Sequence, residues 1–421
     1  MDERTKTFVL NAIAELPRLV EESLRSIKQR RFFVNELKQA IDTSGQRIFL
    51  IAGLRGTGKT TALYQLFSEK NGELIAYLSC DELLSREISL EDAVSALDLI
   101  KKESVGLGKK FLILLDEITY LENWDLKLKV LSDKRPNLTI IATSSSSLPL
   151  KKTKELARRA FELQALPFSF REYLALKYGI EISDEISKKI KKKAGKESLD
   201  GEYIQVRAAL GNYNLFGLYE EYMLHDLPPA LTLSEQAYGE AIIRIVKRTV
   251  YEDFSKYEKL ESKLLVAAEI LIKYLSTIPA DGVKISTLAE VTGISKESVV
   301  KLLDTFEMAM IVKGVEFSGR NRMYKKPKKW FFYSPSMRYI LASPVSNASD
   351  LTGNLREDSV FRHLVSFSRD IFYSHEADFV TDDLKLEVGK DKKARPGTVR
   401  ITMDEGIAVD KIPMPLFALS V

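Results

Sequence analysis

The chain holds few of the sulfur and nitrogen ligands from which many metal centres are built. Its 421 residues include one cysteine and three histidines. These counts exclude a disulfide framework, an iron–sulfur cluster and a zinc site made of cysteine and histidine side chains. Because no histidine lies near Cys80 in the sequence, we interpret this cysteine as a small buried residue and not as a nucleophile.

Long apolar runs are also missing. No stretch approaches the roughly 20 residues that a helix needs to cross a bilayer. Residues 1–22 mix charged and apolar side chains at helical spacing and contain no apolar core or cleavage site of a signal peptide. We therefore expect a cytoplasmic protein with no membrane partner.

Neither sign of charge dominates the chain. Lysine and arginine together number 63, aspartate and glutamate 59, so the net charge is +4. This balance does not mark the whole chain as a nucleic-acid binder. Apolar residues make up 45% and charged residues 29%, which excludes wholesale disorder. At about 150 residues per domain, the length predicts two to four domains.

Short apolar runs alternate with helical patterns in the first part of the chain. Such runs are typical of strands buried on both faces of a parallel sheet. They lie at 47–52, 74–78, 111–115 and 138–142, and the helical patterns between them include 61–67, 90–102 and 124–132. The order predicts an α/β fold with a doubly wound parallel sheet. After about residue 150 we expect no further strand of this sheet, and residues 165–245 read as helices.

A glycine-rich segment follows the first predicted strand. Residues 53–60, Gly-Leu-Arg-Gly-Thr-Gly-Lys-Thr, fit the pattern G-x-x-x-x-G-K-[ST]. Glycines let the backbone wrap a phosphate, so that successive N–H groups and a helix N-terminus point at the anion. Lys59 is expected to reach the β- and γ-phosphates of ATP, and Thr60 to give its hydroxyl to Mg²⁺. The predicted nucleotide-binding residues are Gly53, Arg55, Gly56, Thr57, Gly58, Lys59, Thr60 and Thr61.

Two carboxylates end the predicted strand at 111–115. Asp116 is placed to hold Mg²⁺ through water, and Glu117 to polarise the water that attacks the γ-phosphate. The strand at 138–142 ends in Thr143 followed by four serines, where a hydroxyl is placed to sense the γ-phosphate. The two motifs together predict an ATPase that uses ATP and Mg²⁺.

Three further segments carry a family resemblance. Residues 115–124 (LDEITYLENW), 143–145 (TSS) and 167–173 (PFSFREY) together resemble the prokaryotic, largely archaeal, AAA-type P-loop ATPases. The resemblance implies a P-loop core with a helical lid, a winged helix, and a small α/β region related to PD-(D/E)xK restriction endonucleases. It extends from about residue 28 to about residue 420.

The resemblance also implies roles for single residues. The family's sensor segment falls on Thr143 and Ser144, and Ser144 is taken as a catalytic residue. The family's Gly-Arg pair falls on Arg158 and Arg159, which makes Arg159 the candidate transition-state or sensor arginine. Whether Arg158 or Arg159 acts, and in its own chain or a neighbouring one, stays open, as does the oligomeric state.

Residues 285–309 read as helix, glycine turn and helix, with Ser295 as N-cap of the second helix. Two strand patterns follow at 311–317 and 330–333, so the unit is interpreted as a winged helix. Its inward-facing residues are expected to be Leu288, Val291, Val299, Leu302, Leu303 and Phe306. The segment between the strands offers cations for DNA phosphates, namely Arg320, Arg322, Lys325 and Lys326. Acids on the second helix favour docking of a partner or another domain instead, and both readings stay open.

The C-terminal region contains the acidic pattern of PD-(D/E)xK nucleases. Asp378 and Glu387 match the two metal-binding acids, and Glu357 matches the acid on the preceding helix. Gly389 occupies the usual place of the lysine, and Lys390 follows one position late, which turns it to the other face of a regular strand. We therefore interpret these residues as a relict nuclease site used for binding.

Five parts are predicted along the chain. They are N-terminal helices at 1–45, the ATPase core at 46–165, a helical lid at 166–256, a winged helix at 257–342 and a nuclease-like domain at 343–421. The main hypothesis is an ATPase that couples nucleotide state to movement of the winged helix and the C-terminal region, with DNA as a candidate partner. One alternative is an ATP-gated binding switch for a protein or DNA partner, with slow hydrolysis, and a second is an ATP-controlled, Mg²⁺-dependent DNA nuclease.

Overall fold

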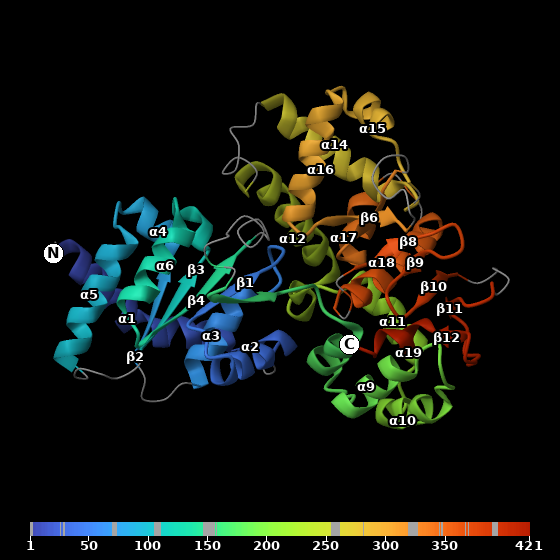
Figure 1. Cartoon of the computed structure of the whole chain (residues 1–421), viewed down its shortest axis with the longest axis horizontal. Helices are drawn as coiled ribbons and strands as arrows, with labels where there is room; N and C mark the ends of the chain where they lie inside the picture. The colour runs from blue at the N-terminus through green and yellow to red at the C-terminus, as the bar shows by residue number, and fades with distance from the viewer. Residues whose placement is uncertain are drawn as a thin grey trace. The chain divides into compact units, whose positions relative to one another are not determined.

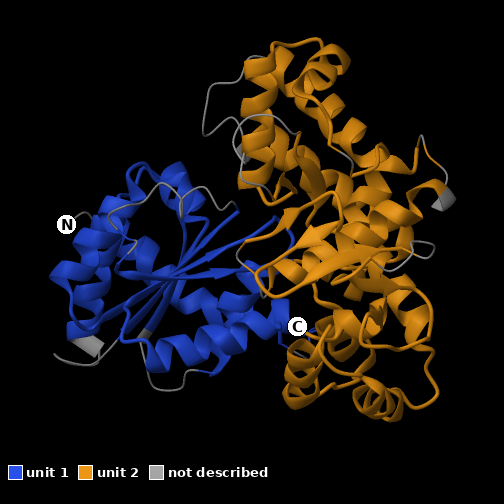
Figure 2. Ribbon diagram, turned by 45° about the vertical axis from the view of Figure 1, so that its right-hand side comes forward, with its two compact units in different colours: residues 1–166 blue, residues 167–421 orange. Residues whose placement is uncertain are grey.

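The chain folds into two compact units, residues 1–166 and 167–421 (Figures 1 and 2). The description rests on a computed structural model. It describes residues 3–25, 27, 30–69, 74–104, 111–145, 156, 158–253, 262–280, 282–318, 327–344, 346, 348–366, 368, 370–389 and 395–421. None of the helices in these ranges is long and apolar enough to cross a membrane.

The first unit is an α/β layer structure. Its helices are α1 (Glu3–Leu24), α2 (Phe32–Thr43), α3 (Lys59–Glu69), α4 (Cys80–Ser85), α5 (Leu90–Ser104) and α6 (Trp124–Lys134), with a 3-10 turn, η1, at Ile118–Tyr120. Its strands are β1 (Ile48–Ala52), β2 (Leu74–Ser79), β3 (Phe111–Asp116), β4 (Leu138–Ser144) and β5 (Ala160–Gln164). Within the described residues they form one parallel sheet in the order β2-β3-β4-β1-β5. The predicted parallel α/β fold is therefore confirmed.

Helices cover both faces of this sheet, because successive strand residues point to opposite sides. In β1, Ile48 and Leu50 pack with apolar residues of α1, α4, α5 and α6. Phe49 and Ile51 pack on the other face with residues of α2 and α3. The sheet is thus doubly wound. Helices α1 and α2 are part of its two cores, and α1 continues unbroken past Pro17.

Strand β5 corrects the expectation that no strand follows residue 150. It pairs in parallel with β1, with Ile48 opposite Ala160 and Ala52 opposite Gln164. Its sequence is Ala-Phe-Glu-Leu-Gln, and of these five residues only Leu163 is buried, at this edge of the sheet. A strand of this kind contains no continuous apolar run, which is the signal that marks β1 to β4.

The second unit begins with the predicted helices. They are α8 (Phe170–Tyr173), α9 (Asp184–Lys193), α10 (Asp200–Leu210), α11 (Leu215–Leu224) and α12 (Glu235–Arg248), with π-helical turns η2 (Leu174–Tyr178) and η4 (Thr249–Asp253) and a 3-10 turn η3 (Pro228–Leu231). On α9, the lysines at 188, 189, 191 and 192 are exposed, as a solvated helix face requires.

Three helices and two strands then follow. The last two helices and the two strands have the predicted order, whereas the first helix was not predicted. The elements are α14 (Ser262–Thr277), α15 (Ile285–Thr292), α16 (Lys296–Met308), β6 (Val312–Phe317) and β7 (Lys329–Phe332). Gly293 ends α15 with a φ of +68°, and the Ser295 hydroxyl accepts the N–H of Ser298, so the predicted N-cap is confirmed. Val291 is 39% exposed and does not face inward as expected, because α15 buries its Leu288 face.

The remaining elements complete a second sheet. They are α17 (Pro335–Ala342), α18 (Ala348–Val365), β8 (Phe372–Tyr373), β9 (Phe379–Val380), β10 (Lys385–Val388), β11 (Val399–Thr402), β12 (Lys411–Pro413) and α19 (Met414–Ala418). Among the described strands the order is β12-β11-β10-β9-β8-β6-β7. Strands β6 and β7 are antiparallel, and β6 pairs in parallel with β8. This sheet crosses the predicted boundary at 342, so the five-part division stays a prediction.

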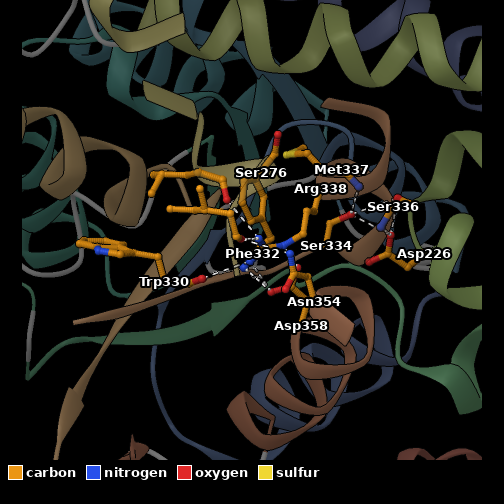
Figure 3. Close-up of polar contacts among 12 residues, drawn as sticks. Asp226, Ser276, Trp330, Phe332, Ser334, Ser336, Met337, Arg338, Asn354 and Asp358 are labelled. Carbon is orange, nitrogen blue, oxygen red and sulfur yellow. Dashed lines mark hydrogen bonds and ion pairs between the residues drawn. The ribbon is translucent and has the colours of Figure 1, made fainter. Parts of the chain in front are cut away.

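A buried ion pair lies in the interior of the second unit (Figure 3). Arg338 and Asp358 are fully buried and joined by a contact of 2.5 Å between Nε and Oδ2. The Arg338 guanidinium also donates to the carbonyls of Leu275 and Ile278, at 3.1 Å each, and Asp358 accepts the N–H of Phe332 at 2.9 Å. These bonds connect the end of α14, strand β7, α17 and α18. They also satisfy the two buried charges, each of which would be costly if it were unpaired.

Candidate functional site

The glycine-rich segment connects the end of β1 to the start of α3. Gly56 and Gly58 have φ values of +79° and +85°, in the left-handed region that favours glycine. At Gly53 an added Cβ would lie 2.3 Å from the carbonyl oxygen of Ala165, so a side chain does not fit there. The loop therefore curves as a phosphate-binding loop must, and its first glycine touches the chain just after β5.

Lys59 lies inside the curve of this loop. Its side chain is buried, and its ammonium group donates to the carbonyl oxygens of Gly53 and Leu54, at 3.0 Å each. The charge thus sits at the concave side of the backbone, at the first residue of α3. An anion bound there would meet a lysine and a helix N-terminus.

Asp116, at the end of β3, accepts hydrogen bonds from three hydroxyl groups. Thr60 donates to Oδ2 at 2.8 Å, Tyr77 to Oδ2 at 2.9 Å and Thr143 to Oδ1 at 2.5 Å. These donors come from α3, β2 and β4. The loop helix and the carboxylate strand, predicted to act together, are therefore in direct contact.

Glu117 adopts a left-handed backbone conformation, with φ 52° and ψ 55°. Such a conformation is uncommon for a residue with a side chain and costs of order 1–3 kcal/mol. The Glu117 N–H donates to the Thr143 hydroxyl, and the Glu117 carboxylate accepts the N–H of Ser145, each at 2.9 Å. The turn holds this carboxylate at the carboxyl ends of β3 and β4.

Ser144 lies beside the loop. It is the last residue of β4, stands opposite Ala52 in the register, and accepts the N–H of Gly53 on its carbonyl oxygen at 3.2 Å. Ser144 is therefore close to the loop, and its role as a sensor stays a prediction.

Arg159 does not lie beside the loop of its own chain. It precedes Ala160, which stands opposite Ile48 at the start of β1, whereas the loop follows the other end of that strand. The two ends of β1 are four residue steps apart, about 13 Å at a rise of about 3.3 Å per residue. The Arg159 guanidinium instead forms an exposed ion pair with Asp133. Of the alternatives that the sequence left open, this position argues against action of Arg159 at the loop of its own chain, and the role of the arginine pair stays a prediction.

The oxygen atoms of Thr60 and Asp116 fit a magnesium ion. Mg²⁺ prefers oxygen ligands and keeps several bound waters. The protein therefore needs to supply few ligands, and one hydroxyl and one carboxylate next to a phosphate loop are enough. The 2.8 Å contact between the two side chains shows that they converge on one point.

Electrostatics around Asp116 keep its neighbours protonated. Burial, together with the charge of Asp116, raises the pKa of Tyr77 far above its usual range, so its hydroxyl stays a donor. Burial, followed by the charges of Asp116, Asp81 and Glu117, raises the pKa of Cys80. Cys80 is fully buried, which confirms its interpretation as a small core residue.

Sequence reasoning missed two residues of this site. Tyr77 is 39 residues from Asp116, and the only sign of its role is a polar group inside an apolar strand. Arg31 precedes α2, and its guanidinium is buried and donates to the carbonyl oxygens of Thr57 and Leu166. No motif in the sequence marks Arg31.

The candidate nuclease residues are partly brought together. Asp378 and Glu387 line a cavity of about 370 Å³ in the second unit, with Lys329 and Arg395 also on its wall. The Lys329 ammonium lies 3.6 Å from Asp378 Oδ1. Glu357, on α18, does not line this cavity, and Lys390 lies outside the described residues.

Within the part of the chain that is described, no group of three or more carboxylate, histidine or cysteine side chains is arranged to hold a metal ion. The expected DNA-contacting cations fall outside that part and are not placed by the structure. They are Arg320, Arg322, Lys325 and Lys326.

Comparison with known proteins gives a family match in the first unit and at the start of the second. Residues 45–174 match the model of a family described as AAA domain. An uncharacterized protein of Methanocaldococcus jannaschii, MJ1637, is 29% identical over 96% of this chain and 89% of its own length. An uncharacterized protein of Haemophilus influenzae is 21% identical over 85% of this chain and 84% of its own length.

Two solved structures also match with low overall similarity. A DNA replication initiation factor and the AMPPCP-bound DnaA of Aquifex aeolicus are each 18% identical, with a TM-score of 0.24. They cover 66% and 65% of this chain and 90% and 86% of their own. A TM-score this low does not establish a shared overall fold. Residues 45–174 are similar to an AAA domain, and the phosphate-loop geometry lies within this matched segment.

Proposed function

We propose that this chain binds ATP together with Mg²⁺ in its first unit and hydrolyses it. The observation that carries the proposal is the hydrogen bond from Thr60 to Asp116, 2.8 Å long. It joins the helix that begins at the phosphate loop to the strand that ends in two acids. A glycine-rich turn without this partner would bind an anion but would have no carboxylate with which to complete a hydrolytic site.

Each residue of the site is assigned a role that follows from its chemistry. The loop N–H groups, the N-terminus of α3 and Lys59 hold the phosphates. Thr60 and Asp116 would hold Mg²⁺, which when bound neutralises phosphate charge and orients the γ-phosphate. Glu117 accepts a proton from water as the water oxygen bonds to the γ-phosphorus, and the bond from that phosphorus to the β-phosphate oxygen breaks to release ADP. Ser144 contacts the γ-phosphate from the neighbouring strand.

Lys59→Ala tests the binding part of this proposal. Removing the ammonium group from the loop should weaken binding of a fluorescent ATP analogue at least tenfold, because hydrogen bonds to charged groups are worth about 1.5–3 kcal/mol. The control is Lys38→Ala, which removes a lysine of the same unit that pairs with Glu69 on α3. Equal affinity in both variants would contradict the assignment of Lys59.

We further propose that the hydrolysis cycle acts on the second unit, and that DNA is one candidate partner. Helices α14 to α16 and the antiparallel pair β6–β7 follow the order of a winged helix. The glycine turn at Gly293 and the cap at Ser295 support that reading. Many-fold stimulation of ATP hydrolysis by duplex DNA would support a DNA-driven motor, whereas indifference would favour a switch gated by a protein.

The nuclease alternative is less favoured. Lys329 lies beside Asp378, at the place where a nuclease would need its metal, and Glu357 is absent from the lining of the same cavity. We propose a binding role for this cavity. Mg²⁺-dependent cleavage of DNA that disappears in Glu387→Ala would overturn that view.

A further inference from the structure

Arg31 is a buried arginine at the start of α2, outside every motif of the site. Arg31 is 6% exposed, and the central carbon of its guanidinium group lies 5.2 Å from the centre of the Phe33 ring. An arginine stays charged at any ordinary pH, so such burial is unfavourable unless its N–H groups are well satisfied. Two of its hydrogen bonds go to backbone carbonyls that lie far apart in the sequence.

The first of these carbonyls belongs to the phosphate loop. The Nη1 group of Arg31 donates to the carbonyl oxygen of Thr57, which lies between Gly56 and Gly58. In a planar trans peptide the C=O and the following N–H point in opposite directions. By holding the Thr57 carbonyl, Arg31 therefore turns the N–H of Gly58 away from itself. It restricts a peptide that two glycines would otherwise leave free to rotate.

The second carbonyl belongs to the last residue of the first unit. The Nη2 group of Arg31 donates to the Leu166 carbonyl oxygen at 2.8 Å. The preceding residue, Ala165, donates its N–H to Ala52 at 2.7 Å and meets Gly53 so closely that no side chain fits. Residues 165–166 are thus tied to the start of the loop directly and to its middle through Arg31.

The next residues are held firmly within the second unit. Arg362 donates to the Pro167 carbonyl, with its Nε at 2.9 Å. The Phe168 N–H donates to the Asp226 carbonyl at 2.7 Å, and the Phe170 N–H to Nε2 of His363 at 3.1 Å. Residues 165–166 are therefore bonded to the loop within the first unit, and residues 167–170 are bonded to α18 and to the segment after α11 within the second.

We propose that Arg31 is a positioning residue that couples the phosphate loop to residues 165–170, which we call the exit segment. It sets the loop in its phosphate-binding shape and transmits a change of that shape to residues 165–170. The proposal rests on the proposed function, because it requires a nucleotide in the loop. It assigns to Arg31 a role in the signal between the units and not in the chemistry.

The test compares Arg31→Met and Arg31→Lys with the wild type and with Arg30→Met. Arg30 is the adjacent arginine, but it forms a partly exposed ion pair with Glu69 and so serves as the matched control. Two quantities are measured on the full chain. They are the dissociation constant of a fluorescent ATP analogue, and the amide hydrogen exchange of peptides covering 165–170 with and without saturating ATPγS.

In the wild type and in Arg30→Met, ATPγS should slow exchange at 165–170. Arg31→Met should bind the analogue at least tenfold more weakly, because two charged hydrogen bonds are lost. At saturating nucleotide it should also lose the change in exchange. Arg31→Lys keeps the charge but cannot bridge two carbonyls, so it should recover affinity in part and not the exchange response.

The outcomes separate the two proposals. If the wild type binds no nucleotide, the proposed function fails and the coupling fails with it. If the wild type binds and Arg31→Lys matches it in affinity and in exchange, only the coupling by Arg31 is overturned. Arg31→Lys decides this even if Arg31→Met does not fold.

Discussion

The carboxylate of Asp116 gathers hydroxyl groups from three different elements of the first unit. Thr60, Tyr77 and Thr143 all donate to it. A carboxylate that accepts several hydrogen bonds is held in one orientation, and side chains locked in this way place a metal or a water reproducibly. Thr143 has a second task, because its oxygen accepts the N–H of Glu117. One hydroxyl thus aligns both acids.

Thr143→Val should therefore impair hydrolysis strongly. The change removes the hydroxyl from a fully buried position and leaves a buried N–H and a carboxylate oxygen without their partner, at a cost of about 1–3 kcal/mol. We expect kcat for ATP to fall at least tenfold. Thr143→Ser keeps the hydroxyl and should stay within about threefold of the wild type. Equal rates in the valine and serine variants would show that the hydroxyl does not align the acids.

Asp226 lies in the interior of the second unit, and its surroundings lead us to predict a pH-dependent contribution to stability (Figure 3). Burial raises its pKa to about 7, although hydrogen bonds from Ser336 and Ser334 and the charge of Arg362 act to lower it. Tyr222 and Tyr238 also face it, and burial raises the pKa of both. The folded chain therefore holds a proton on Asp226 that the unfolded chain loses near pH 4.

The sign of the pH effect follows from this difference. Between about pH 4 and pH 7 the folded state binds more protons than the unfolded state, so this group makes stability fall as pH rises. Asp226→Asn removes the titration. It should raise the urea midpoint of unfolding at pH 8 and change it little at pH 4, whereas Asp304→Asn, on the exposed face of α16, should do neither. A lower midpoint for Asp226→Asn at pH 8 would contradict the account.

Single residues of the site differed in how far the sequence could reveal them. Lys59, Thr60, Asp116 and Glu117 were predicted because phosphate and metal binding need these residue types at a characteristic spacing. Tyr77 was not predicted, because its role depends on which strand pairs with β3 and on the direction of one side chain. The position of Arg159 relative to the loop could not be predicted for the same reason, since it follows from the register of β5 on β1.

At the scale of elements, Ala165, the residue that follows β5, lies close against the first glycine of the loop. Gly53→Ala places a methyl group 2.3 Å from the Ala165 carbonyl, so the backbone at 165–166 must move. We expect a loss of about 1–3 kcal/mol in stability and weaker nucleotide binding. Gly239→Ala, in α12 with open space around it, should instead stabilise the chain by roughly 0.5–1 kcal/mol.

Thermal unfolding with and without nucleotide measures both variants. If Gly53→Ala unfolds and binds like the wild type, the close approach of the exit segment to the loop is wrong. If Gly239→Ala is destabilised, the assignment of that position to an open helix face is wrong. The two variants are expected to change stability in opposite directions, so a general effect of adding a methyl group cannot explain both changes.

Elements were predicted best where one physical signal dominates. The strands β1 to β4 are buried on both faces, and their continuous apolar runs mark them clearly. Strand β5 lies at an edge and carries Glu162 and Gln164, so the same signal is absent. Val291 was placed inside because helical spacing defines a face only approximately, and the neighbours of α15 decide which side is covered.

At the scale of the whole molecule, the sequence indicates the order of the parts better than their limits. The helices predicted at 1–45 complete the two cores of the first unit. The strands of the predicted winged helix continue into the sheet of the predicted nuclease-like region. Neither fact is visible in local patterns, because pairing between distant segments leaves no periodicity in the sequence.

The central claim is that the first unit hydrolyses ATP with Glu117 as the base. The most direct measurement is phosphate release from ATP by the wild type and by Glu117→Gln, with nucleotide affinity measured on the same samples. We predict that Glu117→Gln binds ATP within about threefold of the wild type and releases phosphate at least 100-fold more slowly, since a general base contributes about 10²–10⁴-fold. Phosphate release by Glu117→Gln at the wild-type rate would contradict the account.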